Sequence, residues 1–475
     1  MTVQARAFAQ AAAEEQRPER HPDSGSPGRR LVSWLRTGRR WYAGSFGFQV
    51  VRLSLLLLIP GGLMGFVVVG TAAEALGQGV GAKHGAGDNR GAGASGLDAA
   101  GRAVMSNRGG PAQPAARAID GALSWLARHQ MADGGWSLQN YVQRCKDPTC
   151  RGPGNIEADT GATALGVLPF LAAGQTHRTK GPYRVNVNAA IQWLIGHQQK
   201  SDGNLTAGAA QPMYSHALAT IALCEDCDMT GDDSVRQAAV RAVDYIVMAQ
   251  NKTTGGWRYT PGDSGDTSVL GWQVMALKSA VMAGCLMARD DGRNGLPFDG
   301  AGKWLDSVQS GPNNSRYCYQ PGTGPANTMT AVGLLSRQYL EVRSDSPMMA
   351  DGVKYLMDHM PGEDFRHASN MYYVYHATQV LHNMNNREWD TWNRRVRDLL
   401  VKSQNCDNGS CANGSWDPAG DQWGHSGGRL MMTSLATLTL ETYFRYLPLF
   451  KAYFSAGAAP GGNAPEAKPA AAGEK

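Results

Sequence analysis

Acidic, imidazole and hydroxyl side chains stand at the start of six long apolar segments of the chain. These starts read Asp159-Thr160, Tyr214-Ser215-His216, Asp266-Thr267, Asn327-Thr328, Tyr372-Tyr373 with His376, and His425-Ser426. Carboxyl and imidazole groups exchange protons when a site adjusts their pKa. Asp159, Asp266 and His425 are therefore the candidate catalytic residues. The competing interpretation of each Asp, Asn or Thr is a helix cap, which accepts hydrogen bonds from exposed backbone N–H groups.

Aromatic and amide side chains near the same starts predict a cavity that holds a ligand. The expected cavity-binding residues are Tyr214, His216, Trp272, Asn327, Tyr373, His376 and Trp423. Aromatic rings supply broad apolar surface with polar edges, which suits either an apolar ligand or a sugar. In a carbohydrate site Trp272 and Trp423 would be the stacking platforms, and Asp421 would join the candidate carboxylates.

A sixfold repeat positions these residues. Aligned on the residue five before a Gln or its equivalent, the copies fall at Trp125, Trp193, Tyr245, Trp304, Tyr355 and Leu399. The first half of a copy is amphipathic, with Ile119 and Leu123 opposite Arg128, whereas the second half, such as 163–171, carries almost no charge. A repeat this long indicates stacked helical hairpins. The expected fold is all-α: an (α/α)6 toroid over 116–450, with amphipathic helices outside and apolar helices inside.

One repeat motif resembles that of a known superfamily. The pattern Trp125 … Gln130 … Gly135-Trp136 resembles the Gln-Trp repeat of squalene–hopene cyclases and other terpenoid cyclases, in the same toroid superfamily as protein prenyltransferase β subunits. The segment 266–277 is similar to an inner helix of those cyclases. The resemblance implies the toroid fold and a cavity for an apolar, isoprenoid-type ligand. The motif itself is structural, because the Gln amide can satisfy free backbone groups at a helix end while the Trp ring stacks over it.

The sequence lacks the motifs behind three activities of this superfamily. It contains no Asp-Xaa-Asp-Asp acid of class II cyclases, no matching zinc ligands of prenyltransferases and no Gly-Cys-Gly-Glu-Gln thioester. We therefore expect no cofactor and no metal. Three functions stay open: binding or transformation of an isoprenoid-type ligand, a polysaccharide lyase or hydrolase acting in the cavity, and a non-catalytic binding or scaffold module.

An uncharged segment ahead of the repeats predicts a membrane anchor. Residues 53–73 carry no charge over a length sufficient to cross a bilayer, and an Arg-rich segment, 1–52, precedes them. The positive-inside rule makes 1–52 cytoplasmic and the toroid extracytoplasmic, or periplasmic. Residues 74–115 read as a Gly/Ala-rich linker and 451–475 as a disordered tail. The alternative is a signal sequence cut near Ala73.

The eight cysteines favour an oxidising compartment. Cys145 and Cys150 share one short polar loop, and Cys406 and Cys411 share a second loop of similar design. We predict the disulfides Cys145–Cys150 and Cys406–Cys411. The other four cysteines are less informative: Cys224 and Cys227 form a third closely spaced pair, and Cys285 and Cys318 are isolated in the sequence. For the Cys224–Cys227 pair a disulfide or buried thiols are favoured over half a zinc site.

The charge of the chain argues against one class of partner. The formal net charge is only +5, and basic residues form no stripe interleaved with aromatic residues. A nucleic-acid surface concentrates Lys and Arg on one face. We therefore expect no nucleic acid, and expect the membrane and an apolar lipid or a glycan as partners.

Overall fold

The computed structural model describes residues 112–442, apart from 146, 149, 207–208, 210, 287–294, 364 and 368. The predicted cytoplasmic segment, the membrane span 53–73, most of the linker and the tail lie outside the described residues. Within the described part, no helix combines the length and apolar character that a membrane crossing requires.

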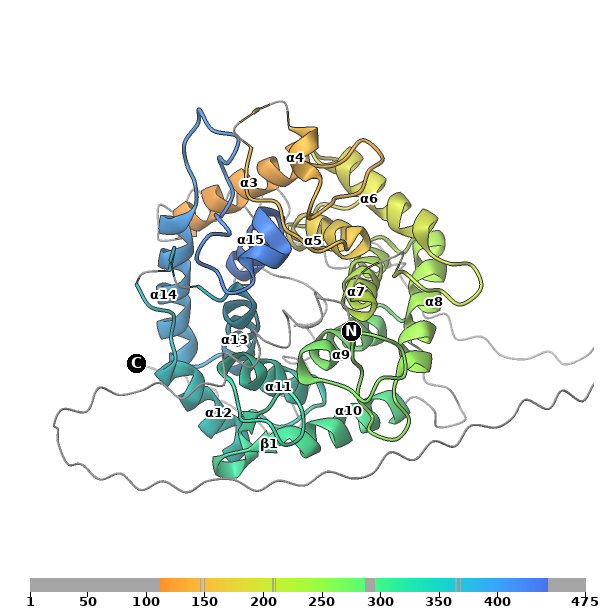
Figure 1. The fold of residues 1–475 in the computed structure, drawn as a ribbon, viewed down its shortest axis with the longest axis vertical. Helices are drawn as coiled ribbons and strands as arrows, with labels where there is room; N and C mark the ends of the chain where they lie inside the picture. Colours follow the sequence, from red (N-terminus) through yellow and green to blue (C-terminus); the bar gives the residue numbers. More distant parts are fainter. Residues whose placement is uncertain are drawn as a thin grey trace, which may run out of the picture. The chain divides into compact units, whose positions relative to one another are not determined.

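The described residues form two concentric rings of helices (Figure 1). The outer ring consists of α3 (Ala112–Arg128), α6 (Arg184–His197), α8 (Asp233–Ala249), α10 (Gly295–Val308), α12 (Pro347–Asp358) and α14 (Arg387–Ser403). The inner ring consists of α5 (Asp159–Ala172), α7 (Pro212–Thr230), α9 (Thr267–Met282), α11 (Asn327–Tyr339), α13 (Met371–Met384) and α15 (Gly424–Glu441). Each inner helix packs on the next, and the contacts of α15 with α5 and of α14 with α3 close both rings. The predicted all-α toroid of six hairpins is confirmed for the described residues.

Burial explains why the two halves of each repeat differ in composition. In inner helix α5 every residue after Asp159 is buried, and the segment carries no other charge. In outer helix α14 only 5 of 17 residues are buried, namely Trp389, Trp392, Val396, Leu399 and Leu400. A helix covered on all sides must be apolar all round, whereas a helix at the rim needs one apolar stripe.

Four of the six hairpin junctions share one hydrogen-bond arrangement. In each, a buried Gln donates from Nε2 to a Gly carbonyl in its own turn and to a carbonyl of the next outer helix. These bonds run from Gln130 to Gly134 and Asn186, from Gln198 to Gly203 and Ala238, from Gln250 to Gly255 and Pro297, and from Gln404 to Gly414 and Ala118. The Gln therefore ties one hairpin to the next, as the sequence predicts.

The remaining two junctions are built differently. Gln309 lies in a two-residue strand, β1 (Gln309–Ser310), that pairs antiparallel with β2 (Arg316–Tyr317) across the short 3₁₀ helix η1 (Pro312–Asn314). At the next junction Arg395 of α14 donates from Nε to the carbonyl of Pro361 at 3.2 Å. At the Gln309 junction Arg316 of β2 donates to the Asp351 carbonyl of α12 at 3.0 Å, so at both junctions an arginine side chain makes the bond between hairpins that the Gln makes elsewhere.

The cysteines require a correction. All eight are free thiols, so neither the Cys145–Cys150 nor the Cys406–Cys411 disulfide is present. The two loops pack against each other where the ring closes, and Cys145 Sγ lies 3.0 Å from Cys411 Sγ of the other loop. The spacing in the sequence suggests that each cysteine pairs within its own loop, whereas the fold brings cysteines of different loops together. The cysteines therefore no longer support an oxidising compartment.

Candidate functional site

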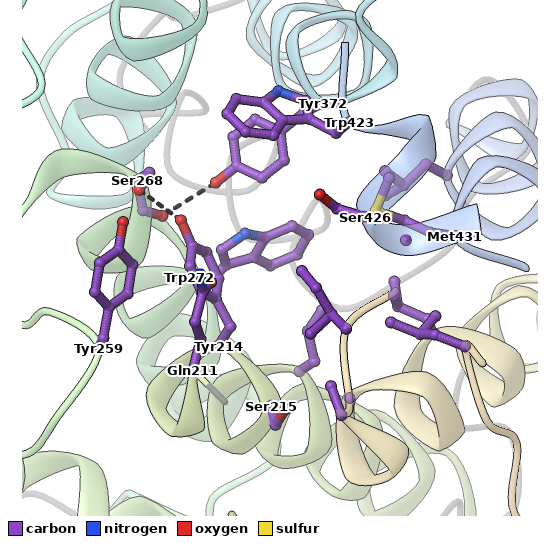
Figure 2. Close-up of a pocket in the computed structure, with 18 of the residues that line it drawn as sticks. Gln211, Tyr214, Ser215, Tyr259, Ser268, Trp272, Tyr372, Trp423, Ser426 and Met431 are labelled. Carbon is purple, nitrogen blue, oxygen red and sulfur yellow. Dashed lines mark hydrogen bonds between the residues drawn. The ribbon is translucent and has the colours of Figure 1, made fainter. Parts of the chain in front are cut away.

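A cavity of about 150 Å³ lies inside the inner ring (Figure 2). All six inner helices contribute to its wall. The contributing side chains and glycines are Gly161 and Leu165 of α5, Tyr214, Ser215 and Leu218 of α7, Ser268 and Trp272 of α9, Thr328 and Met329 of α11, Tyr372 of α13, and Ser426, Gly427, Met431 and Leu435 of α15. Loop residues complete it: Leu138, Ile156, Ala158, Gln211, Tyr259, Tyr319, Ala326 and Trp423.

One side of the cavity is a hydrogen-bonded polar wall, which we define as Tyr214, Tyr259, Ser268, Tyr319 and Tyr372. Ser268 Oγ donates to the carboxylate of Asp266 at 2.6 Å. Since this uses the single hydroxyl proton of Ser268, Tyr214 must donate its own proton across the 2.5 Å contact to Ser268 Oγ. Tyr372 donates to the Ser268 carbonyl oxygen at 3.1 Å (Figure 2).

A second chain of bonds reaches the same carboxylate. Tyr319 donates to Asp266 Oδ2 at 3.3 Å, so Tyr259 must donate to Tyr319 across their 2.6 Å contact. All four tyrosine protons are therefore directed away from the cavity. What the polar wall offers a ligand is hydroxyl oxygen lone pairs, which accept hydrogen bonds.

Asp266 lies one layer behind this wall. Its side chain caps α9 by accepting from the Val269 N–H at 2.8 Å, as the capping interpretation predicts. Burial is complete and raises the pKa of Asp266 to about 6, against the lowering effect of its hydrogen bonds and of Arg258. The Arg258 Nε atom is 3.7 Å from Asp266 Oδ2, too far for a tight ion pair. Asp266 therefore changes charge in mildly acidic solution, within two hydrogen bonds of the cavity.

The opposite side of the cavity is mainly aliphatic, although Ser215 and Ser426 also line it. Its aliphatic side chains are those of Leu138, Ile156, Leu165, Leu218, Met431 and Leu435. Trp272 projects its ring between the two sides, stacked on Tyr375 with ring centroids 5.7 Å apart and edge-on to Tyr372 at 6.0 Å. This packing fixes the indole plane, so the cavity presents a rigid aromatic surface beside its aliphatic one.

The structure separates the predicted cavity-binding residues into two groups. Tyr214, Trp272 and Trp423 line the cavity. The other four do not: His216 bridges the Leu205 N–H and the Ala242 carbonyl, Asn327 accepts from the Tyr355 hydroxyl, Tyr373 donates to the His359 carbonyl, and His376 donates from Nδ1 to the Tyr372 carbonyl. The side chains of His216, Asn327 and Tyr373 join neighbouring elements, whereas His376 bonds within its own helix. Burial lowers the pKa of both His216 and His376 to about 4, so both rings are neutral at physiological pH.

The three candidate catalytic residues do not form one constellation at the cavity. Asp159 is exposed in the first turn of α5, and His425 is exposed at the start of α15 with its Nε2 3.2 Å from Ser426 Oγ. Neither lines the cavity. Asp421 is buried and accepts from the Met371 N–H at 2.8 Å and the Ser369 hydroxyl, which holds the start of α13. Asp266 alone of these carboxyls is connected to the polar wall by the bonds described above.

Sequence reasoning missed four members of the wall: Tyr259, Ser268, Tyr319 and Tyr372. Two of them had a local signal, since Ser268 lies two residues after Asp266 and Tyr372 precedes Tyr373 at the same helix start. Tyr259 and Tyr319 lie in loops ahead of α9 and α11, where no periodic pattern marks them. Within the described residues, the one group of three or more metal-ligating side chains lies at the closure of the ring and not in the cavity.

The fold and the cavity define an α/α-toroid protein with a central, largely apolar pocket. No protein-family model and no curated protein matches the chain. Similar solved structures include an α-amylase from Clostridium perfringens (TM-score 0.48, 10% identity, 69% of this chain and 97% of the other) and an α-1,6-mannanase of Salegentibacter sp. HEL1_6 (0.45, 9%, 69% and 98%). A type II terpene cyclase from Scytonema is similar too (0.45, 12%, 70% and 97%). These likenesses concern the fold alone.

Proposed function

We propose that the central cavity binds a small apolar molecule that carries a hydroxyl group, an isoprenoid-type alcohol being the class that fits best. The observation that supports this is the division of the cavity into a mainly aliphatic and aromatic side and a side formed by the hydrogen-bonded polar wall. Apolar surface supplies most of the affinity of such pockets, and a few polar groups fix the orientation.

The direction of the hydrogen bonds supports a donor on the ligand. With Asp266 ionised, the protons of Tyr214 and Ser268 are committed toward the carboxylate. The Tyr214 oxygen can then accept from a ligand hydroxyl, whereas a ligand carbonyl at the same place would meet only the lone pairs of the polar wall. Below the pKa of Asp266, near 6, the carboxyl proton allows the chain to reverse and to donate toward the cavity.

A carbohydrate hydrolase is the second candidate. Two indoles, Trp272 and Trp423, line the cavity and would suit stacking on sugar rings. The mannanase and the amylase among the solved structures are enzymes of this kind by name. Glycoside hydrolysis ordinarily uses two carboxyl groups that flank the scissile bond. Among the described residues that line the cavity there is no Asp or Glu, which favours binding over hydrolysis.

The test is a binding comparison with full-length protein. A polyprenyl alcohol, its parent hydrocarbon and a mannose oligosaccharide would be titrated by isothermal calorimetry. One hydrogen bond of about 1–1.5 kcal/mol predicts that the alcohol binds about five- to tenfold more tightly than the hydrocarbon. Tyr214→Phe should remove that preference, because it deletes the accepting oxygen.

Tyr373→Phe is the matched control, since its hydroxyl donates to the His359 carbonyl away from the cavity. The control should keep the preference for the alcohol. Equal affinity for alcohol and hydrocarbon would contradict the proposed role of the polar wall. Saturable oligosaccharide binding with release of new reducing ends would replace the proposal by the hydrolase.

We also propose that residues 53–73 anchor the toroid to a membrane with 1–52 in the cytoplasm. This proposal is based on the uncharged span and its Arg-rich flank. In cells with a permeabilised outer envelope, added protease should release the toroid and leave the N-terminus protected. A toroid that stays protected would contradict the orientation, and a mature N-terminus near Ala73 would indicate cleavage.

A further inference from the structure

Four metal-ligating side chains converge where the first and the last hairpin meet. His129 follows outer helix α3, Cys145 and Cys150 lie in the loop after the short helix α4 (Tyr141–Arg144), and Cys411 lies in the loop after α14. One potential ligand atom of each lies within 4.8 Å of the others. We propose that His129, Cys145, Cys150 and Cys411 bind one zinc ion that closes the ring.

The spacing of the four atoms suits a tetrahedral ion. His129 Nε2 lies 3.2 Å from Cys411 Sγ and 3.7 Å from Cys150 Sγ, and the sulfurs of Cys145 and Cys411 are 3.0 Å apart. Zinc bonds of about 2.3 Å to sulfur and about 2.0 Å to nitrogen place tetrahedral ligands roughly 3.5–3.8 Å from one another. Small side-chain rotations convert the observed cluster into that arrangement.

The histidine is already in the tautomer that a metal requires. Its Nδ1 is 2.8 Å from the carbonyl oxygen of Trp125, which can only accept, so Nδ1 carries the proton. The lone pair of Nε2 is thereby directed at the thiols. The ring is fully buried and stacks on Trp125 with centroids 4.1 Å apart. A backbone partner on the second nitrogen is the usual way in which proteins orient a zinc-binding histidine.

The surrounding groups hold the two loops together and place a positive charge near the site. Asp147 accepts from the Cys411 N–H through Oδ2 at 3.0 Å, and its carbonyl accepts from the Cys150 N–H at 3.1 Å. Three thiolates and one zinc ion carry a net charge of about −1. The buried Arg429 donates to the carbonyl of Arg151, adjacent to Cys150, and it also pairs with the carboxylate of Asp417 at 2.6 Å, so its positive charge offsets only part of that excess.

The position of the cluster in the fold indicates a structural role for the ion. Cys145 and Cys411 are 266 residues apart in sequence, so the site joins the two ends of the ring. A structural zinc site contributes binding free energy to folding. Cys150 is buried while Cys145 and Cys411 are half-buried, which leaves a path for an ion to enter. No local motif marks this site in the sequence, because its ligands come from two distant loops and a helix end.

The experiment measures zinc in the full-length protein purified under reducing conditions without a chelator. Elemental analysis should give about one zinc per chain, and Cys411→Ser should lower zinc affinity at least about 100-fold. Cys406→Ser is the matched control, because this exposed cysteine lies in the same loop outside the cluster, and it should keep the zinc.

A spectroscopic measurement on the wild-type protein tests the site even if the Cys411→Ser variant fails to fold. Replacement of zinc by cobalt should give thiolate-to-metal charge-transfer absorption and the ligand-field bands of a tetrahedral ion. Wild-type protein that takes up neither zinc nor cobalt would overturn the proposal. A Cys145–Cys411 disulfide in freshly isolated protein, or equal zinc loss in Cys406→Ser and Cys411→Ser, would overturn it as well.

Discussion

The junctions between hairpins and the polar wall of the cavity are organised in opposite ways. At four junctions the same Gln amide bonds the same two kinds of carbonyl, so one solution is used repeatedly. The polar wall occurs once, and its hydroxyls come from different hairpins and loops that meet in front of Asp266. Repetition therefore builds the ring, and the departures from repetition build the site.

This difference suggests that the junction residues determine the stability of the fold, whereas the wall residues determine ligand preference. A junction residue contacts the backbone of the next hairpin, so its replacement should lower the free energy of unfolding of the whole toroid. A wall residue forms hydrogen bonds with its neighbours around the cavity. Its replacement should leave the toroid folded and should change the pH dependence of stability or the ligand preference instead. The following predictions test this separation, in order of decreasing effect on stability.

The largest effect is expected for Gly255→Ala at the third junction. Gly255 has φ +78°, and an added Cβ would lie 2.0 Å from the carbonyl oxygen of Gly300 in α10. Backbone strain and a clash with backbone should together lower the free energy of unfolding by at least about 4 kcal/mol. Urea denaturation followed by circular dichroism measures this.

Gly262→Ala is the control, since Gly262 has φ +80° but no atom within 4 Å of the added Cβ. It isolates the conformational cost, about 1–2 kcal/mol. Similar losses in the two variants would show that contact with the next hairpin adds nothing to the junction.

The next effect is a pH dependence caused by Asp266. Burial raises its pKa from 3.8 to about 6. Between these values the unfolded chain has lost the proton that the folded chain still holds, so stability falls as pH rises. The full loss is about 3 kcal/mol, complete above the folded pKa. Urea midpoints between pH 4 and pH 7 should show this slope in the wild type and a flatter one in Asp266→Asn.

A slope of the same sign should remain in Asp266→Asn, because burial also raises the pKa of Asp421. Asn keeps a capping oxygen for the Val269 N–H, so the variant should fold normally. An unchanged slope would mean that Asp266 is not the buried acid described here.

A smaller loss is expected for Gln250→Leu. The substitution leaves the carbonyls of Gly255 and Pro297 without their side-chain donor in a buried place, which costs about 2 kcal/mol. Gln309→Leu, at a junction without this arrangement, should cost less than about 1 kcal/mol because its amide oxygen accepts from Arg337 in a half-buried position. Equal losses would remove the distinction between the two kinds of junction.

The smallest effect is expected for His425→Gln. The imidazole is exposed and does not line the cavity. Unfolding free energy should change by less than about 0.5 kcal/mol, and the affinity for the polyprenyl alcohol should not change. A loss of binding in this variant would show that His425 belongs to the ligand-binding site.

The ring was predictable from the sequence because most hairpins repeat a local pattern. Gln130, Gln250 and Gln404 each precede a Gly-rich turn and a Trp, and spacing alone identifies them. The wall has no such rule: Tyr259 and Tyr319 meet across 60 residues only after the hairpins are packed. For the same reason the sequence marks Tyr372 and Tyr373 together at one helix start but does not show which of them faces the cavity, because the register of α13 decides it. The pairing of Cys145 with Cys411 likewise depends on closure of the ring.

The most direct test of the central claim is the identity of the molecule that occupies the cavity. Full-length protein purified in mild detergent would be analysed by native mass spectrometry, followed by extraction of the bound molecule. The account predicts about one apolar alcohol per chain. We also predict loss of that alcohol in Ala158→Trp, because Ala158 lines the cavity and the indole would fill part of it. A glycan in its place, or the same alcohol retained in full by Ala158→Trp, would contradict the account.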